Sequence, residues 1–162
     1  MKSAPPPPLQ LAISLPTMLT VRQGMDFDHF IAAQDPVYAE VVRELADGKK
    51  CSHWMWFIFP QLRGLGYSAT SQKFALGSLD EARRYLEHPV LGTRLRECTE
   101  LVLKTQNRTA EDIFGSVDAM KLRSSMTLFS LCSPTNGLFD LVIEKYFAGK
   151  KDDRTIELLR TH

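Results

Sequence analysis

The run from His53 to Ser71 constrains the fold more than any other part of this sequence. Both tryptophans of the chain lie in it, and every side chain from Trp54 to Phe59 is large and apolar. Large aromatic side chains dominate the free energy of burial, so a core has to form around this block. A continuous apolar run of this length is either a buried helical turn or a buried strand, because periodicity cannot separate the two. Pro60 ends the element in both cases.

Helix signals occur along the rest of the chain after the N-terminal region, and no segment shows a convincing strand alternation. Apolar residues recur at helical spacing after candidate caps and before glycine or proline stops. The cap candidates are Asp26, Asp35, Ser78, Thr109, Ser116 and Asp153, and the stops are Gly48, Pro89, Pro134 and Gly149. The helix expected from Val117 to about Cys132 contains the apolar residues Met120, Leu128 and Leu131. The sequence therefore predicts an all-α fold, a compact multihelical single domain of about seven to eight short helices.

The first 24 residues differ in composition from the rest. Pro5–Pro8 form a polyproline tract, which cannot join a helix or a sheet ladder. The mildly apolar stretch Leu9–Leu19 is too short to span a membrane. We expect residues 1–24 to be a disordered or loosely packed tail and residues 25–162 to form the multihelical domain. The alternatives are a secretory signal or a start codon placed too early, with the true start at Met18 or Met25.

Composition and charge limit the classes of partner. The 162-residue chain is 44% hydrophobic and 24% charged with a net charge of +1, as expected for one ordinary soluble globular domain. No basic tract stands out, so we expect neither a nucleic-acid nor a membrane partner. The three cysteines lie far apart, and the four histidines show no metal-ligand spacing. We therefore expect free thiols, a cytoplasmic location, no metal and no cofactor, and the oligomeric state stays open.

Two stretches resemble the signatures of a known family. One is His53–Gln61 followed by Gly64-Leu65-Gly66, and the other is Lys121–Phe129. Over roughly Phe27 to Leu159 the chain is similar to a small bacterial family of unknown function, whose members are often mislabelled "calpastatin" in genome annotation. The resemblance implies a compact multihelical domain and no established activity. The calpastatin label does not fit, because that inhibitor is a disordered polypeptide and this composition is globular.

The catalytic candidates are His53 and a group formed by Lys121, Ser124 and Ser125. His53 can act as a general acid or base, because its charge changes near neutral pH, or it can hydrogen-bond at a helix start. The lysine and the two serines share one face of an expected helix, where a lysine can activate a serine nucleophile. In the structural alternative, small serines allow close helix packing while the lysine reaches solvent.

A loop rich in glycine and hydroxyl groups follows Pro60. Gly64–Ala69 fits the loose G-x-G-x-x-A pattern of dinucleotide-binding proteins, but Pro60 separates it from any strand and no second strand with an acidic end follows. Glycines let backbone N–H groups approach a ligand, so the loop can instead hold an anion. The alternative is a tight turn with ordinary polar side chains. The ligand-binding candidates are Trp54, Trp56, Gln61, Arg63, Gly64, Gly66, Ser68 and Ser71.

These features lead to three hypotheses of function. The first is a cytoplasmic protein that binds a small anionic ligand, nucleotide-like or phosphate-bearing, in a pocket beside the aromatic block. The second is a hydrolase or transferase that uses His53 or the Lys121 group, and the third is a protein–protein adaptor with an exposed aromatic patch. For the first, we expect the Gly64–Ser71 loop and the Lys121–Ser125 helix face to line one pocket with His53, because buried polar groups need partners.

Overall fold

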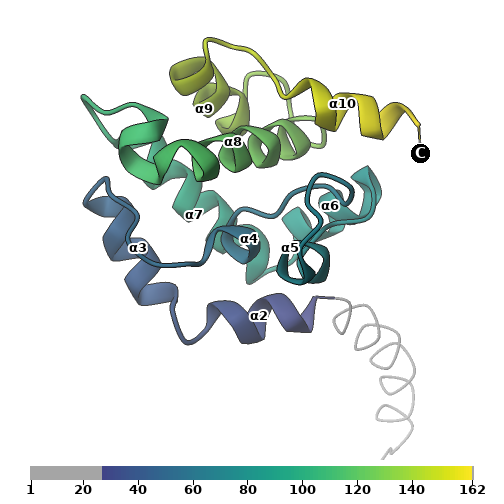
Figure 1. Cartoon of the computed structure of the whole chain (residues 1–162), viewed down its shortest axis with the longest axis horizontal. Helices are drawn as coiled ribbons and strands as arrows, with labels where there is room; N and C mark the ends of the chain where they lie inside the picture. The colour runs from purple at the N-terminus through teal and green to yellow at the C-terminus, as the bar shows by residue number, and fades with distance from the viewer. Residues whose placement is uncertain (1–26, 162) are drawn as a thin grey trace, which may run out of the picture.

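The computed structural model describes residues 27–161, so the expectations for residues 1–24 and for a cap at Asp26 lie outside the described residues. Helices keep the labels of Figure 1. The described part contains α2 (Asp28–Gln34), α3 (Tyr38–Ala46), α4 (Met55–Ile58), α5 (Ala69–Lys73), α6 (Leu79–Glu87), α7 (Leu91–Lys104), α8 (Ala110–Ser130), α9 (Leu138–Phe147) and α10 (Asp153–Arg160). Between residues 27 and 161 no strand forms, and an isolated parallel bridge pairs Leu62 with Leu76.

The prediction of an all-α multihelical fold is confirmed, with nine helices in residues 27–161 instead of seven to eight. Two of them are short: α4 lies inside the His53–Ser71 run and α5 begins at its end, where an apolar block and a polar loop give no helical period. The segments on either side of Gly115, which the sequence separates, continue as one helix with a kink.

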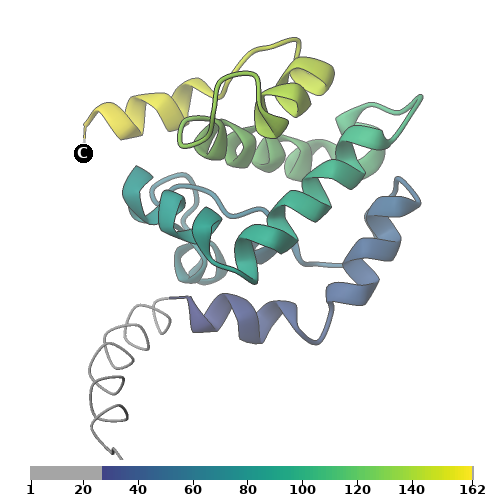
Figure 2. The ribbon, with the colours of Figure 1, turned by 180° about the vertical axis from the view of Figure 1, so that it is seen from behind.

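The helices are arranged around the His53–Ser71 run. Helices α8, α9 and α10 lie on one side of the molecule and α2 on the other, with α4 to α7 between them (Figure 1). Figure 2 shows α7 crossing the molecule between α3 and α6, and it packs against both. Helix α8 packs against α6, α9 and α10, so this long helix connects α6 in the middle of the molecule with α9 and α10 on one side.

The aromatic block forms a single helical turn in the core. Trp54, Met55, Ile58 and Phe59 are buried, whereas Trp56 and Phe57 are only partly buried. A single turn places side chains on all sides, so two of the six large apolar residues reach the edge of the core. The Trp56 side is the part of the block that borders a cavity.

A buried carboxylate holds the residues that directly precede this helical turn. Glu44 on α3 accepts hydrogen bonds from the Trp54 ring N–H at 2.9 Å and from the backbone N–H groups of Cys51 and Ser52 at 2.7 and 3.0 Å. The Ser52 hydroxyl donates to its second oxygen at 2.6 Å. Burial alone would raise the pKa of the Glu44 carboxyl, but these hydrogen bonds lower it from 4.5 to about 2. Glu44 is therefore ionised and ties α3 to the aromatic block.

Two expected helix caps are present. The Ser78 hydroxyl accepts from the Glu81 backbone N–H at the start of α6. Thr109 and Asp112 form a reciprocal capping box at the start of α8. In both cases the cap and its partner are three residues apart, so a local sequence pattern was enough to locate them.

Two other expected caps are displaced. Asp35 ends α2 rather than starting α3, which begins only at Tyr38, and the Asp35 carboxylate pairs with Arg94 at 2.9 Å. The last helix is capped by Asp152 rather than by Asp153. A one-residue difference between adjacent aspartates depends on tertiary contacts, which local propensity does not contain.

Gly115 kinks α8. Its φ of +81° and ψ of 164° lie in a region that only glycine adopts readily. The short first segment of α8 therefore runs in a different direction from the segment that contains Lys121. No helix of the described residues combines the length and the apolar character needed to cross a bilayer.

Candidate functional site

The loop between Gln61 and Leu76 is closed at its base by backbone hydrogen bonds. The Arg63 N–H donates to the Leu76 carbonyl at 2.7 Å, and the Leu76 N–H donates to the Gln61 carbonyl at 2.9 Å. Inside the loop, the Ser68 hydroxyl caps α5 by accepting from the Ser71 N–H at 3.1 Å. The loop is therefore a compact unit attached to the aromatic block.

Two glycines allow the loop to fold this tightly. Gly64 has a φ of +105°, and a Cβ there would lie 3.3 Å from Leu158 Cδ1 on α10. At Gly66 an added Cβ would lie 2.6 Å from the Ser71 hydroxyl oxygen. The glycines thus serve the close packing of the loop on itself and on α10.

Helix α8 holds the start of α10 beside the loop. The Asp152 backbone N–H donates to the Thr127 hydroxyl at 2.8 Å, and the Ser124 hydroxyl donates to the Asp152 carboxylate at 3.0 Å. These bonds place the first turn of α10 next to the face of α8 that contains Lys121 and Ser124.

The loop, α8 and the start of α10 surround an open cavity of about 450 Å³, a size typical of small-molecule sites. Three segments far apart in sequence line it: Trp56, Gln61, Leu65, Gly66, Tyr67 and Ser71; Val117, Met120, Lys121 and Ser124; Asp152 and Arg154. A hollow of only about 20 Å³ adjoins it and also contains Arg63 and Gly64. It has room for about one water molecule.

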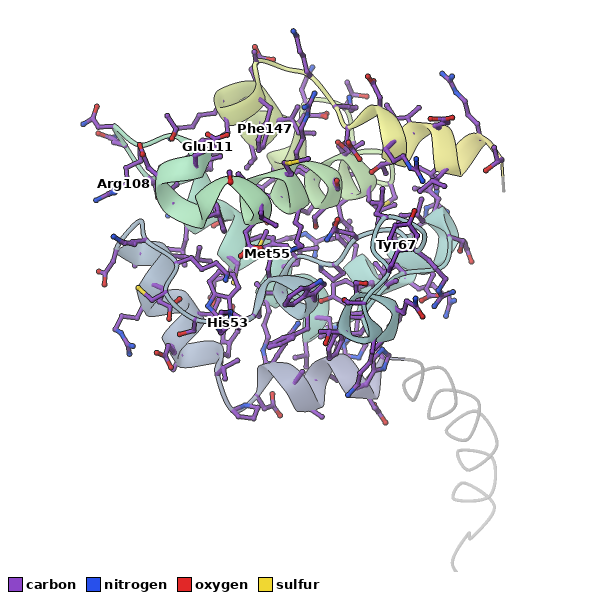
Figure 3. All side chains as sticks on the ribbon, in the orientation of Figure 1. His53, Met55, Tyr67, Arg108, Glu111 and Phe147 are labelled. Atoms are coloured by element: carbon purple, nitrogen blue, oxygen red, sulfur yellow. The ribbon has the colours of Figure 1, made fainter. Side chains whose placement is uncertain are left out.

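Large apolar side chains form the rim of this cavity. Tyr67 is 81% exposed, Met120 72% and Val117 65%. Single exposed apolar residues are ordinary, but three around one opening indicate a surface that a ligand or partner can cover. Figure 3 shows Tyr67 projecting below α10, well apart from His53.

Positive charge lies against the aromatic wall. The Lys121 ammonium is 4.6 Å from the centre of the Trp56 ring, and it also donates to Asp118 Oδ1 at 3.1 Å. Asp118 Oδ2 pairs with the Lys50 ammonium at 2.9 Å. Burial alone would raise the pKa of the Asp118 carboxyl, but the two ammonium groups hold it below its usual range. One carboxylate thus balances two lysines.

The ligand-binding candidates fall into three groups. Trp56, Gln61, Gly66 and Ser71 line the cavity. Arg63 and Gly64 line only the small hollow. Trp54 and Ser68 line neither, because Trp54 is buried with its N–H bonded to Glu44 and Ser68 is used as the cap of α5.

The catalytic candidates do not converge. His53 is exposed and lies outside the cavity, on the far side of α4 from Tyr67 in Figure 3. Lys121 and Ser124 line the cavity, but among the described residues Lys121 bonds to Asp118 and Ser124 bonds to Asp152 and the Met120 carbonyl. Ser125 is fully buried, and its hydroxyl has no hydrogen-bond partner in the described part of the chain. The expected pocket therefore joins the loop to the α8 face without His53.

The sequence reading missed six lining residues: Leu65, Tyr67, Val117, Met120, Asp152 and Arg154. A usable signal existed for two of them, because Val117 lies four residues before Lys121 and Met120 four residues before Ser124. Met120, an apolar residue of that expected helix, is exposed. No local pattern pointed to Asp152 and Arg154, which reach the site through the packing of α10.

Within residues 27–161 no three His, Cys, Asp or Glu side chains come together in a way that would hold a metal ion. The cavity wall instead offers ammonium, guanidinium, amide and indole donors with one carboxylate. This set of groups can bind an anion that also has an aromatic or apolar part.

Comparison with known proteins identifies a family of unknown function. Residues 24–159 match the model of a family described as "Protein of unknown function (DUF1810)". The crystal structure of the conserved hypothetical protein Rv1873 from Mycobacterium tuberculosis superposes with a TM-score of 0.82 at 50% sequence identity. The match covers 83% of this chain and 96% of that one. No curated protein matches the chain significantly.

Proposed function

The chain belongs to the DUF1810 family of unknown function, and we propose that it binds a small anionic ligand, nucleotide-like or phosphate-bearing, in the cavity between the loop, α8 and α10. The observation that supports this most directly is Lys121, held over the Trp56 ring at the cavity wall. A cation beside an aromatic face offers charge and stacking surface in one place. Free cysteines at positions 51, 98 and 132 support a cytoplasmic setting for this activity.

The charge around the cavity favours an anion. Arg154 lines the cavity and has no ion pair among the described residues, while Lys50 and Lys121 share the single carboxylate of Asp118. Asp152 contributes one negative charge to the wall. The balance of these five groups is one positive charge, and a phosphate would satisfy the donors that Arg154 leaves open.

The shape of the site favours a small molecule over a flat protein surface. Trp56 and Leu65 form part of the wall and the exposed Tyr67 and Met120 stand at the rim, so a planar ring can be covered on more than one side. A protein–protein adaptor would present its exposed aromatic side chain on an open face, whereas Tyr67 belongs to a concave site.

The geometry does not favour the hydrolase or transferase hypothesis. A serine nucleophile needs a base within hydrogen-bond reach and access to substrate. Ser125 is sealed in the core, and in the described residues the Lys121 ammonium bonds to Asp118 rather than to either serine. We therefore propose that the chain binds a ligand, and we propose no reaction.

A thermal-shift screen against nucleotides, phosphosugars and inorganic phosphate tests the proposal. A ligand that binds only the native state at a hundredfold excess over its Kd stabilises it by about 2.7 kcal/mol, which raises the melting temperature by several degrees. We expect nucleotides to give the largest shifts.

A matched pair of lysine variants assigns any shift to the cavity. Lys121→Met removes the ammonium over Trp56, while Lys73→Met removes a comparable ammonium, 5.3 Å from the Phe74 ring, that does not line the cavity. We expect the shift to be lost only with Lys121→Met. A screen in which no anionic compound shifts the melting temperature, or in which both variants respond like the original chain, would contradict the proposal.

A further inference from the structure

Several polar groups on the cavity wall already have hydrogen-bond partners within the protein. The Ser71 hydroxyl donates to the Ser68 carbonyl at 2.9 Å, and the Ser124 hydroxyl donates to Asp152 at 3.0 Å. In contrast, within residues 27–161 the Trp56 ring N–H and the Arg154 guanidinium make no hydrogen bond. These open groups are donors, so they select for acceptors on a ligand.

Asp152 differs from them because it offers an open acceptor. Its Oδ2 accepts from the Ser124 hydroxyl, from the Thr155 backbone N–H at 3.1 Å and from the Thr155 hydroxyl. Its Oδ1 accepts no hydrogen bond from the described residues, and this atom is accessible to solvent. The carboxylate is thus held in place through one oxygen, and the residue lines the cavity.

We infer that the ligand donates a hydrogen bond to Asp152 Oδ1 through a hydroxyl group, which makes a ribonucleotide the class of ligand; this rests on the proposed function. A free carboxylate oxygen needs a donor once a ligand has excluded water from it. An ammonium group would add positive charge beside Arg154 and Lys121, whereas a ribose hydroxyl is neutral. A ribonucleotide supplies a phosphate for the cations, a base for the aromatic rim and a hydroxyl for Asp152.

Calorimetric titration of the full chain with AMP and with 2′,3′-dideoxy-AMP tests this inference. The two nucleotides share the phosphate and the base and differ only in the sugar hydroxyls. A hydrogen bond to a charged group corresponds to about a tenfold difference in affinity, so we expect AMP to bind about tenfold more tightly.

The variant Asp152→Asn identifies the acceptor. Asparagine caps helices as well as aspartate does, so α10 keeps its start, with the amide oxygen facing the Ser124 and Thr155 donors. The amide NH₂ then replaces Oδ1 at the cavity. We expect a melting temperature close to that of the original chain and a preference for AMP well below tenfold, because the amide NH₂ can donate only a neutral hydrogen bond to the sugar hydroxyl.

The outcomes separate this inference from the proposed function. Equal affinities of AMP and 2′,3′-dideoxy-AMP for the original chain would overturn the inference and leave anion binding intact. An undiminished tenfold preference in Asp152→Asn would also overturn it, because the hydroxyl bond would then not depend on the carboxylate. If neither nucleotide binds, the inference fails, and the thermal-shift screen with phosphosugars and inorganic phosphate decides the proposed function separately.

Discussion

Phe57 and Phe59 are two residues apart in the aromatic block, yet their surroundings differ. Phe59 is fully buried and packs near Trp54 and Phe114, whereas Phe57 is only partly buried and contacts Phe74. We predict that Phe59→Ala lowers the free energy of unfolding by about 3–5 kcal/mol, because it removes a complete core side chain. Phe57→Ala should cost clearly less. Urea unfolding of the two variants checks this, and equal losses would show that the block is buried uniformly.

Glu44 makes the free energy of unfolding depend on pH in the acid range. Its pKa is lowered from 4.5 to about 2 on folding, so its contribution is present above pH 4.5 and is lost as pH falls toward 2. Glu44→Gln imitates the protonated side chain, and at pH 7 it should lower the free energy of unfolding by about 3 kcal/mol. We predict that the gap between the original chain and this variant closes as pH falls from 5 toward 2. Denaturant titrations at several pH values measure it, and a gap independent of pH would contradict the account.

At the scale of elements, Gly115 kinks α8 between two helical segments, which the sequence predicts as two separate helices. A Cβ at Gly115 would meet no atom within 4 Å, so the cost of Gly115→Ala comes from its backbone conformation alone. We predict a loss of about 1–3 kcal/mol in the free energy of unfolding. The neighbouring exposed residue gives the control, since Ser116→Ala should stay within about 0.5 kcal/mol of the original chain. A neutral Gly115→Ala would show that the kink can straighten without cost.

The elements that local patterns define were predictable, and those defined by contacts were not. Thr109 and Asp112 three residues apart predicted the start of α8. The apolar block Trp54–Phe59 predicted a buried element but not its type, because a single turn has no period. The polar face of α8 and the glycine loop were both chosen as parts of one site, and the structure brings them together. Their missing partner, the start of α10, depends on the long-range bond between Thr127 and Asp152.

At the scale of the whole molecule, the family match begins at residue 24 and the described structure begins at Phe27, whose ring packs 5.6 Å from that of Tyr85. We predict that a chain starting at Met25 melts cooperatively at nearly the temperature of the full chain, because the core contacts of the described helices are then complete. Circular dichroism melts of both chains measure this. An insoluble or non-cooperative shorter chain would show that the first 24 residues contribute to the core.

The account depends most on the cavity, and two arginines of α10 provide its test. Arg154 lines the cavity, while Arg160 is also exposed on the same helix and does not line it. Neither side chain has an ion pair among the described residues, so removing either should leave the fold stable.

The decisive measurement is calorimetric titration of AMP into the full chain, Arg154→Ala and Arg160→Ala. The account predicts one binding site in the full chain, an affinity at least about tenfold lower for Arg154→Ala and an unchanged affinity for Arg160→Ala. If the two variants bind AMP equally well, the cavity between the loop, α8 and α10 is not the site that we propose, and if AMP does not bind at all, a ribonucleotide is not the ligand.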